Sequence, residues 1–165
     1  MITYTIAPDR ELSSTDNIPG LTSFLSEVSH MPTTMELTIP LENRPGTLGR
    51  ICRALADQKV NIMAFQAVPS EGNSLVRFVV DQPERAKKAL DNEGLSYQET
   101  QVALARLPHR PGELARTASR LGDAEININY AYCGVDPNTN APLVVFGVTD
   151  VGLAAPIIDR TVAAA

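Results

Sequence analysis

The sequence predicts an α+β fold made of two tandem ferredoxin-like βαββαβ units, with antiparallel sheets and the helices on one face. Two observations lead to it. The segment LENRPGTLGRICRAL, which starts at Leu41, matches LPHRPGELARTASRL, which starts at Leu107. Around each copy, the spacing of apolar residues gives the order strand, helix, strand, strand, helix, and the first copy adds a final strand. Each copy is therefore one supersecondary unit.

The first copy has alternating side chains in its strands and apolar residues three or four apart in its helices. Arg44-Pro45-Gly46 separates the first strand from the first helix, because proline and glycine favour a turn. Polar residues around Gly72 mark a hairpin, and Pro83 suits the start of the second helix. The predicted elements are, in order, a strand at 35–41, a helix at 48–55, strands at 60–68 and 74–80, a helix at 83–90 and a strand at 95–99.

The second copy repeats this order and stops one strand early. Its predicted elements are a strand at 102–107, a helix at 113–122, strands at 126–134 and 143–149, and a short final helix with Pro156 near its start. A missing fourth strand would leave unpaired backbone groups at a sheet edge. Two remedies are open: the alternating N-terminal segment MITYTI supplies a strand, or the edge pairs with another subunit.

These units give three predicted regions: an N-terminal extension at 1–34, a first domain at 35–100 and a second domain at 101–165. Residues 8–34 contain several prolines around one apolar patch with helical spacing. We therefore expect a tether with one or two helical turns.

Composition excludes several classes of function. The hydrophobic content of 44% suits an ordinary globular core, and a net charge of −5 without any basic run argues against nucleic acid. No apolar stretch is long enough to span a bilayer, and the N-terminus has no signal-peptide pattern. We expect a cytoplasmic protein. Cys52 and Cys133 stand alone in the sequence, so neither a disulfide nor a metal site is predicted, and Cys52 is expected to be a buried apolar side chain.

Catalytic motifs are missing from the sequence. His30 and His109 are the two histidines, and neither adjoins a nucleophile motif, a zinc-protease motif or a phosphate-binding loop. We expect no enzymatic activity, no cofactor and no metal.

The segment LENRPGTLGRICRALADQKVNI closely resembles the ACT domains of amino-acid metabolism. The first strand, the Asn-x-Pro-Gly-x-Leu turn, the helix and the VNI strand follow in the same order, and the resemblance covers about residues 35–149. It implies a non-catalytic regulatory module that binds an amino acid between neighbouring ACT units. The loop after the first strand and the start of the second strand would form the site.

The resemblance places the following residues in the site: Asn43, Arg44, Pro45, Gly46, Asn61 and Ile62 in the first copy, and His109, Arg110, Gly112 and Asn127 in the second. Amides at a helix start can hold a carboxylate, glycine lets a ligand approach the backbone, and an asparagine amide can accept from an ammonium group. Leu41 stands where serine-binding ACT domains carry histidine, which argues against serine. His109 replaces Asn43 in the second copy, so we expect two unequal sites.

Other interpretations of these residues stay open. Asn61 and Asn127 can instead satisfy backbone groups at a turn, the arginines can be simply solvated, and His109 can be an ordinary surface histidine or a pH-sensitive contact. Tyr130 and Tyr132 are predicted on the same strand face as Ile126 and Ile128, in the core with their hydroxyl groups at its rim. Asn129 lies with Asn127 on the opposite face, as a weaker candidate.

Three functions follow from the resemblance. The first is a free-standing amino-acid sensor in which the ligand changes dimer geometry or partner affinity. The second is a regulatory subunit of a biosynthetic enzyme, of the acetohydroxyacid synthase small-subunit type, and the third is a purely structural dimerisation module. We expect a homodimer, formed through sheet edges or side by side.

Overall fold

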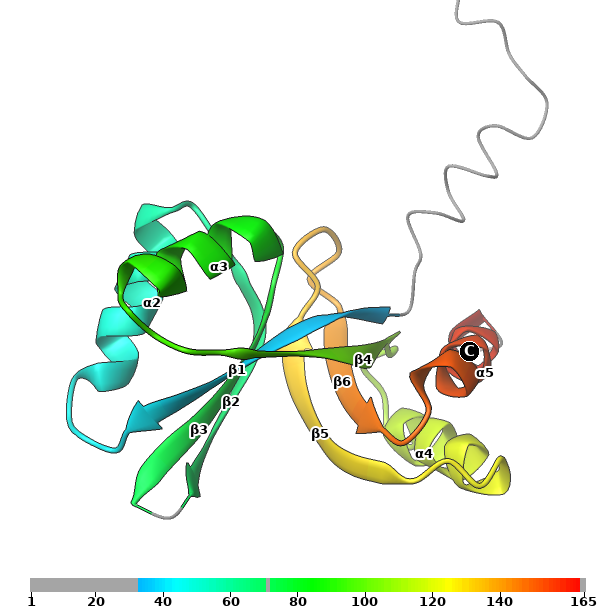
Figure 1. Ribbon diagram of the computed structural model, residues 1–165. Coiled ribbons are helices and arrows are strands. Elements are labelled where there is room, and N and C mark those ends of the chain that lie inside the picture. Colours follow the sequence, from blue (N-terminus) through cyan, green and yellow to red (C-terminus); the bar gives the residue numbers. More distant parts are fainter. Residues whose placement is uncertain (1–32, 71, 164–165) are drawn as a thin grey trace, which may run out of the picture. The chain divides into compact units, whose positions relative to one another are not determined.

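The computed structural model describes residues 33–70 and 72–163, in which strands and helices alternate as the repeat predicts (Figure 1). Their order is β1 (Thr33–Glu42), α2 (Thr47–Asp57), β2 (Ile62–Ser70), β3 (Asn73–Val80), α3 (Pro83–Asn92), β4 (Gln98–Arg106), α4 (Glu113–Asp123), β5 (Ile128–Val135), β6 (Pro142–Val148) and α5 (Val151–Ala163). The α+β class and the repeated order are confirmed. The tether predicted at 8–34 and the MITYTI segment fall almost wholly outside the described residues.

One strand joins the two repeats. The strands predicted at 95–99 and 102–107 are a single strand, β4, because no glycine or proline interrupts residues 98–106. β4 pairs with β1 through residues 98–103 and with β6 through residues 103–106. It is thus the last strand of the first repeat and the first strand of the second.

The six described strands form one closed antiparallel sheet in the order β1-β3-β2-β5-β6-β4. The prediction of two separate sheets was wrong in this respect, since β4 is shared and β2 meets β5. The expected unpaired edge was wrong as well. β1 lies beside β4 where a fourth strand of the second repeat would lie, so the chain pairs this edge itself.

The sheet closes between β2 and β5 through a single residue pair, Ala64 with Gly134. A Cβ atom at Gly134 would lie 2.1 Å from the Met63 carbonyl oxygen and 2.4 Å from the Ala64 Cβ. Only glycine allows the two strands to approach this closely.

Each repeat buries its helices against its own strands. In the first core, α2 and α3 pack on β1 and β3, with Leu37, Ile51 and Phe78 fully buried. Cys52 is half-buried and packs against this core rather than being fully enclosed. In the second core, α4 and α5 pack on β4 and β6 (Figure 1). The helices therefore cover one face of the strands in each repeat.

A third core lies between the repeats, on the strand faces that the helices leave uncovered. It contains side chains from both repeats: Ala64, Val79, Val102, Leu104, Tyr132, Leu143 and Val145. Burial of this face makes residues 31–165 one structural unit.

Strands β2 and β5 carry irregularities at equivalent places, between Ile62 and Ala64 and between Ile128 and Tyr130. Such a bulge changes which face the following side chains occupy. Ile128 packs in the second core, whereas Tyr130 and Tyr132 lie in the third core. The prediction that these tyrosines share a face with Ile126 and Ile128 was therefore wrong.

The long loop between β5 and β6 is anchored by Asp136, whose side chain is 1% exposed. Its carboxylate accepts hydrogen bonds from Arg106 Nε and from the backbone amides of Asn138 (2.9 Å) and Thr139 (3.0 Å). Burial opposes ionisation, but these donors outweigh it and lower the pKa of Asp136 to about 2. The ionised carboxylate holds the loop on β4.

No described helix has the length and apolar character needed to cross a membrane. Over the same part of the chain, no three His, Cys, Asp or Glu side chains gather as a metal site would need.

Candidate functional site

The turn that follows the first strand of each repeat places a glycine at a helix N-cap. Gly46 has φ +87° before α2 and Gly112 has φ +93° before α4. Residues other than glycine rarely adopt this left-handed conformation. A Cβ atom at either position would meet nothing within 4 Å, so the space beside each glycine is open.

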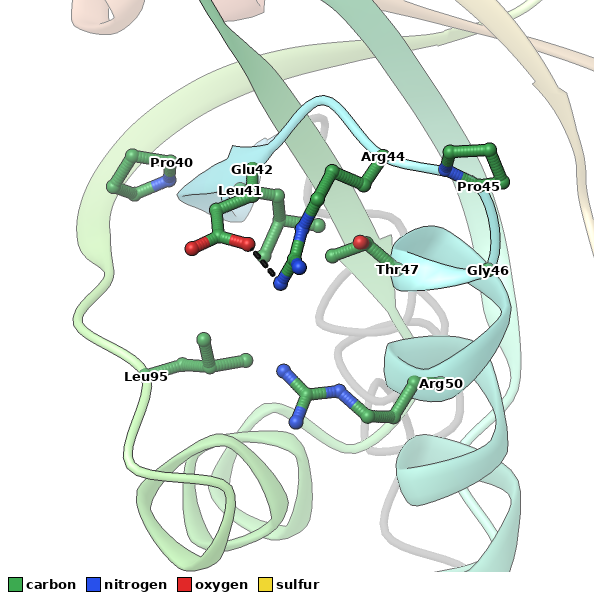
Figure 2. Close-up of a pocket in the computed structure, with 9 residues that line it drawn as sticks. All are labelled: Pro40, Leu41, Glu42, Arg44, Pro45, Gly46, Thr47, Arg50 and Leu95. Carbon is green, nitrogen blue, oxygen red and sulfur yellow. Dashed lines mark ion pairs between the residues drawn. The ribbon is translucent and has the colours of Figure 1, made fainter.

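In the first repeat this turn borders a hollow of about 670 Å³ (Figure 2). Leu41, 3% exposed, and the half-buried Leu95 give it an apolar part. The hollow is lined by Pro40, Leu41, Glu42, Arg44, Pro45, Gly46, Thr47, Arg50 and Leu95. Of the residues predicted here, Arg44, Pro45 and Gly46 line it, whereas Asn43 is exposed beside it and does not.

Two cations and one anion share this hollow. Arg44 forms an ion pair with Glu42, and Arg50 Nη1 lies 3.6 Å from Glu93 Oε2. The side chains of Arg44 and Arg50 are 74% and 60% exposed. The first turn of α2 has neither a side-chain cap nor an acidic residue, so its amides and the positive end of the helix dipole face the same region.

The second repeat has a hollow of about 450 Å³ at the equivalent turn. It is lined by Leu107, Pro108, His109, Arg110, Pro111, Glu113, Leu114, Cys133, Pro142 and Val144, so it is more apolar than the first. Of the residues predicted here, His109 and Arg110 line it, whereas Gly112 does not. The linings of the two hollows therefore differ, and the unequal binding of a ligand at the two sites stays a prediction.

Glu113, in the first turn of α4, is the main residue that sequence reasoning missed. Its Oε1 accepts a hydrogen bond from Arg110 Nε at 2.6 Å, and its Oε2 accepts from Arg116 Nη2 at 2.6 Å and Nε at 3.2 Å. Arg116 and Arg110 lower the pKa of this carboxyl group. The alignment of the two repeats could have identified this residue, because Glu113 is aligned with Thr47 of the first repeat.

The structure does not bring Asn61 and Asn127 to these turns. Asn61 donates from its backbone N and its Nδ2 to the carboxylate of Asp81, both at 2.9 Å. Asn127 Nδ2 donates to Asn129 Oδ1 at 2.9 Å. Among the described residues, neither asparagine lines either hollow.

Sheet register explains this separation. Ile62 pairs with Val80 at one end of β3, whereas Glu42 pairs with Asn73 at the other end. The loop after β1 and the start of β2 therefore lie at opposite ends of one repeat. Ile62 is half-buried and packs against the first core.

The repeat, the Pro-Gly turns and the β-α-β-β order agree with a known family. The family described as "ACT domain pair" matches residues 32–158. The chain belongs to this ACT domain pair family. Its members are regulatory modules that are mostly non-catalytic. No curated protein is similar enough in sequence to match.

Several solved structures share the fold. Protein BT0572 from Bacteroides thetaiotaomicron is 26% identical, with a TM-score of 0.69 over 78% of this chain and 88% of that one. The ligand-free regulatory subunit of aspartate kinase from Thermus thermophilus is 15% identical, with a TM-score of 0.54 over 80% and 93%. A structure of aspartokinase α and β subunits is also 15% identical, with a TM-score of 0.53 over 80% and 93%.

A polar cluster joins the two ACT repeats inside the sheet. Glu36, 0% exposed, accepts hydrogen bonds from the hydroxyl groups of Tyr130 (2.8 Å) and Tyr132 (2.7 Å). Arg77 Nε lies 3.4 Å from Glu36 Oε1, and its guanidinium stacks 4.3 Å from the centre of the Tyr130 ring. Burial, together with the hydrogen bond to Glu36, raises the pKa of Tyr130 to about 12. The polar groups of this cluster are paired with one another, so the cluster links the two repeats and leaves no group free to hold a ligand.

Proposed function

We propose that this chain is a non-catalytic regulatory module that binds an amino acid in the hollow at the β1–α2 turn of the first ACT repeat. The observation that carries the proposal is the mixed charge of this hollow. Two arginines and the uncapped start of α2 stand beside one carboxylate, Glu42, and the apolar Leu41 and Leu95 line the same hollow. Membership in the ACT domain pair family supports a regulatory role.

A zwitterion suits this arrangement. Guanidinium groups and helix-start amides donate hydrogen bonds to a carboxylate, and Glu42 can accept from an ammonium group. The Arg44–Glu42 ion pair is exposed, so exchanging it for ligand contacts costs little free energy. The side chain of the amino acid would contact Leu41 and Leu95.

We further propose that a second copy of the chain completes this site. The hollow is lined by residues of one repeat and is open to solvent at Glu42, Arg44 and Arg50. A neighbouring ACT unit placed over it would bury the ligand between subunits, so that binding and assembly become coupled. Sedimentation with and without the ligand measures this coupling directly.

A second candidate function is that of a regulatory subunit bound to an enzyme. The hollow of the second repeat favours it, because it is largely apolar and Leu114 is 49% exposed there. An exposed apolar surface of this kind suits contact with another protein. Co-purification with a catalytic subunit would support this function.

The first test is thermal unfolding of the purified chain with each of the twenty amino acids. A ligand at 100 times its dissociation constant stabilises the folded state by about 2.7 kcal/mol. We expect a selective increase in Tm that Arg50→Gln removes. Arg53→Gln is the matched control, since Arg53 is an exposed arginine of the same helix that does not line the hollow. If none of the twenty amino acids raised Tm, the amino-acid role would be contradicted and the function as an enzyme's regulatory subunit would be favoured.

A further inference from the structure

We infer that Arg44 and Arg50 form a carboxylate receptor in the first repeat, and that Glu113 permanently fills the matching receptor of the second repeat. The chain then binds one carboxylate ligand rather than two. The identity of this ligand as an amino acid rests on the proposed function; the receptor itself rests on a comparison of the two repeats.

Three positions decide the comparison. In the matching segments LENRPGTLGR and LPHRPGELAR, Arg44 corresponds to Arg110 and Arg50 to Arg116. Both repeats therefore carry an arginine before the Pro-Gly turn and another in the first helix. Between them, Thr47 of the first repeat corresponds to Glu113 of the second.

In the second repeat a carboxylate bridges the arginine pair. Glu113 is 8% exposed, and each of its oxygens accepts a hydrogen bond of 2.6 Å from a different arginine. Glu113 is also the first residue of α4, so its negative charge lies at the positive end of the helix. The position between the two arginines at this turn thus holds a carboxylate in the structure itself.

In the first repeat no carboxylate bridges the two arginines, because Arg44 pairs with Glu42 and Arg50 pairs separately with Glu93. Thr47 is neutral and too short to reach between the guanidinium groups, and Figure 2 shows Arg44 and Arg50 extending into the same hollow. Their side chains are 74% and 60% exposed, whereas those of Arg110 and Arg116 are 53% and 29% exposed. The arginine pair of the first repeat is therefore the more accessible of the two.

The occupant follows from this chemistry. It is a small molecule with a carboxylate, held between two guanidinium groups as Glu113 is, and a hollow of about 670 Å³ has room for it. In the second repeat the same ligand would have to displace a carboxylate that is tied to the chain and paired with two arginines. Because of this competition, the ligand does not bind at the turn of the second repeat.

The test transfers the glutamate between the repeats. Thr47→Glu should fill the first receptor, with Thr47→Gln as the control of equal length without charge. Without any ligand, we expect Thr47→Glu to have a Tm about 2–4 °C above that of Thr47→Gln, and we expect Arg50→Gln to remove this difference. With the amino acid that gives the largest shift in the twenty-member panel, Thr47→Glu should lower affinity by more than about tenfold.

Glu113→Thr should open the second receptor. Calorimetry with the same amino acid should then give two ligands per chain in place of one. Equal Tm values for Thr47→Glu and Thr47→Gln, or unchanged affinity in Thr47→Glu, would overturn the inference. If no amino acid binds the wild-type chain but the arginine-dependent gain in Tm is present, the receptor stands and the amino-acid function fails.

Discussion

Glu36 offers the sharpest test of how the two repeats are held together. Replacing it with alanine removes a buried carboxylate and leaves the hydroxyl groups of Tyr130 and Tyr132 without their acceptor. Arg77, whose side chain is 17% exposed, loses its buried anion as well. Breaking a buried charge pair by removing one partner typically costs about 3–5 kcal/mol. We therefore expect Glu36→Ala to lower the free energy of unfolding by about 3–5 kcal/mol.

Urea unfolding followed by circular dichroism measures this loss. Asp159→Ala is the control, because it removes an exposed carboxylate from α5 and should change stability by less than about 0.5 kcal/mol. Tyr132→Phe in the wild-type chain should cost about 1–3 kcal/mol, and clearly less in a chain that already lacks Glu36. A loss below about 1 kcal/mol for Glu36→Ala, or full additivity of the two changes, would refute the cluster as the link between repeats.

Two more predictions concern the loop anchor and the closure of the sheet. Because Asp136 has a pKa lowered to about 2, its stabilisation is complete above about pH 4 and is lost as the pH falls through about 2. Asp136→Asn should therefore cost about 2 kcal/mol in urea unfolding at pH 7 and much less near pH 2, whereas an equal loss at both would contradict the ionised anchor. Gly134→Ala should cost about 1–3 kcal/mol, since its Cβ would lie 2.1 Å from the Met63 carbonyl oxygen. Gly49→Ala, where a Cβ meets nothing within 4 Å in a helix, should be neutral or stabilising by up to about 1 kcal/mol, and similar losses at both glycines would sink the steric argument.

Most of the local structure could be predicted, because its causes are local. Apolar spacing and turn-forming residues identified the elements from β1 to β6 within a few positions, except that β4 was predicted as two strands, and the repeated Pro-Gly located the starts of α2 and α4. The left-handed φ angles of Gly46 and Gly112 confirm why glycine stands there. The predictions that failed concern contacts between residues far apart in the sequence. The shared strand β4 and the single pair of Ala64 with Gly134 join the two predicted sheets into one closed sheet. Nothing in the spacing of apolar residues encodes that contact.

The candidate site could be predicted only in part, for a similar reason. Arg44, Pro45 and Gly46 adjoin one another in sequence and line one hollow. Asn61 was predicted to lie at this turn from the family resemblance. Its side-chain amide instead donates a hydrogen bond to Asp81, which follows β3 in the sequence. Glu113 was visible in the repeat alignment, but its meaning depends on two arginine contacts that only the folded turn displays.

A sheet that closes on itself has no outermost strand, and this changes how copies of the chain can associate. Among the described strands, each has a hydrogen-bonded neighbour on both sides, so no strand is left wholly unpaired on one side for the addition of a foreign strand. Association by strand exchange would first have to part the ring at its narrowest point, the lone Ala64 and Gly134 pair. A chain in which this contact is weakened would expose the facing edges of β2 and β5 together. These exposed edges would allow domain-swapped dimers and fibrous aggregates, which the closed sheet prevents.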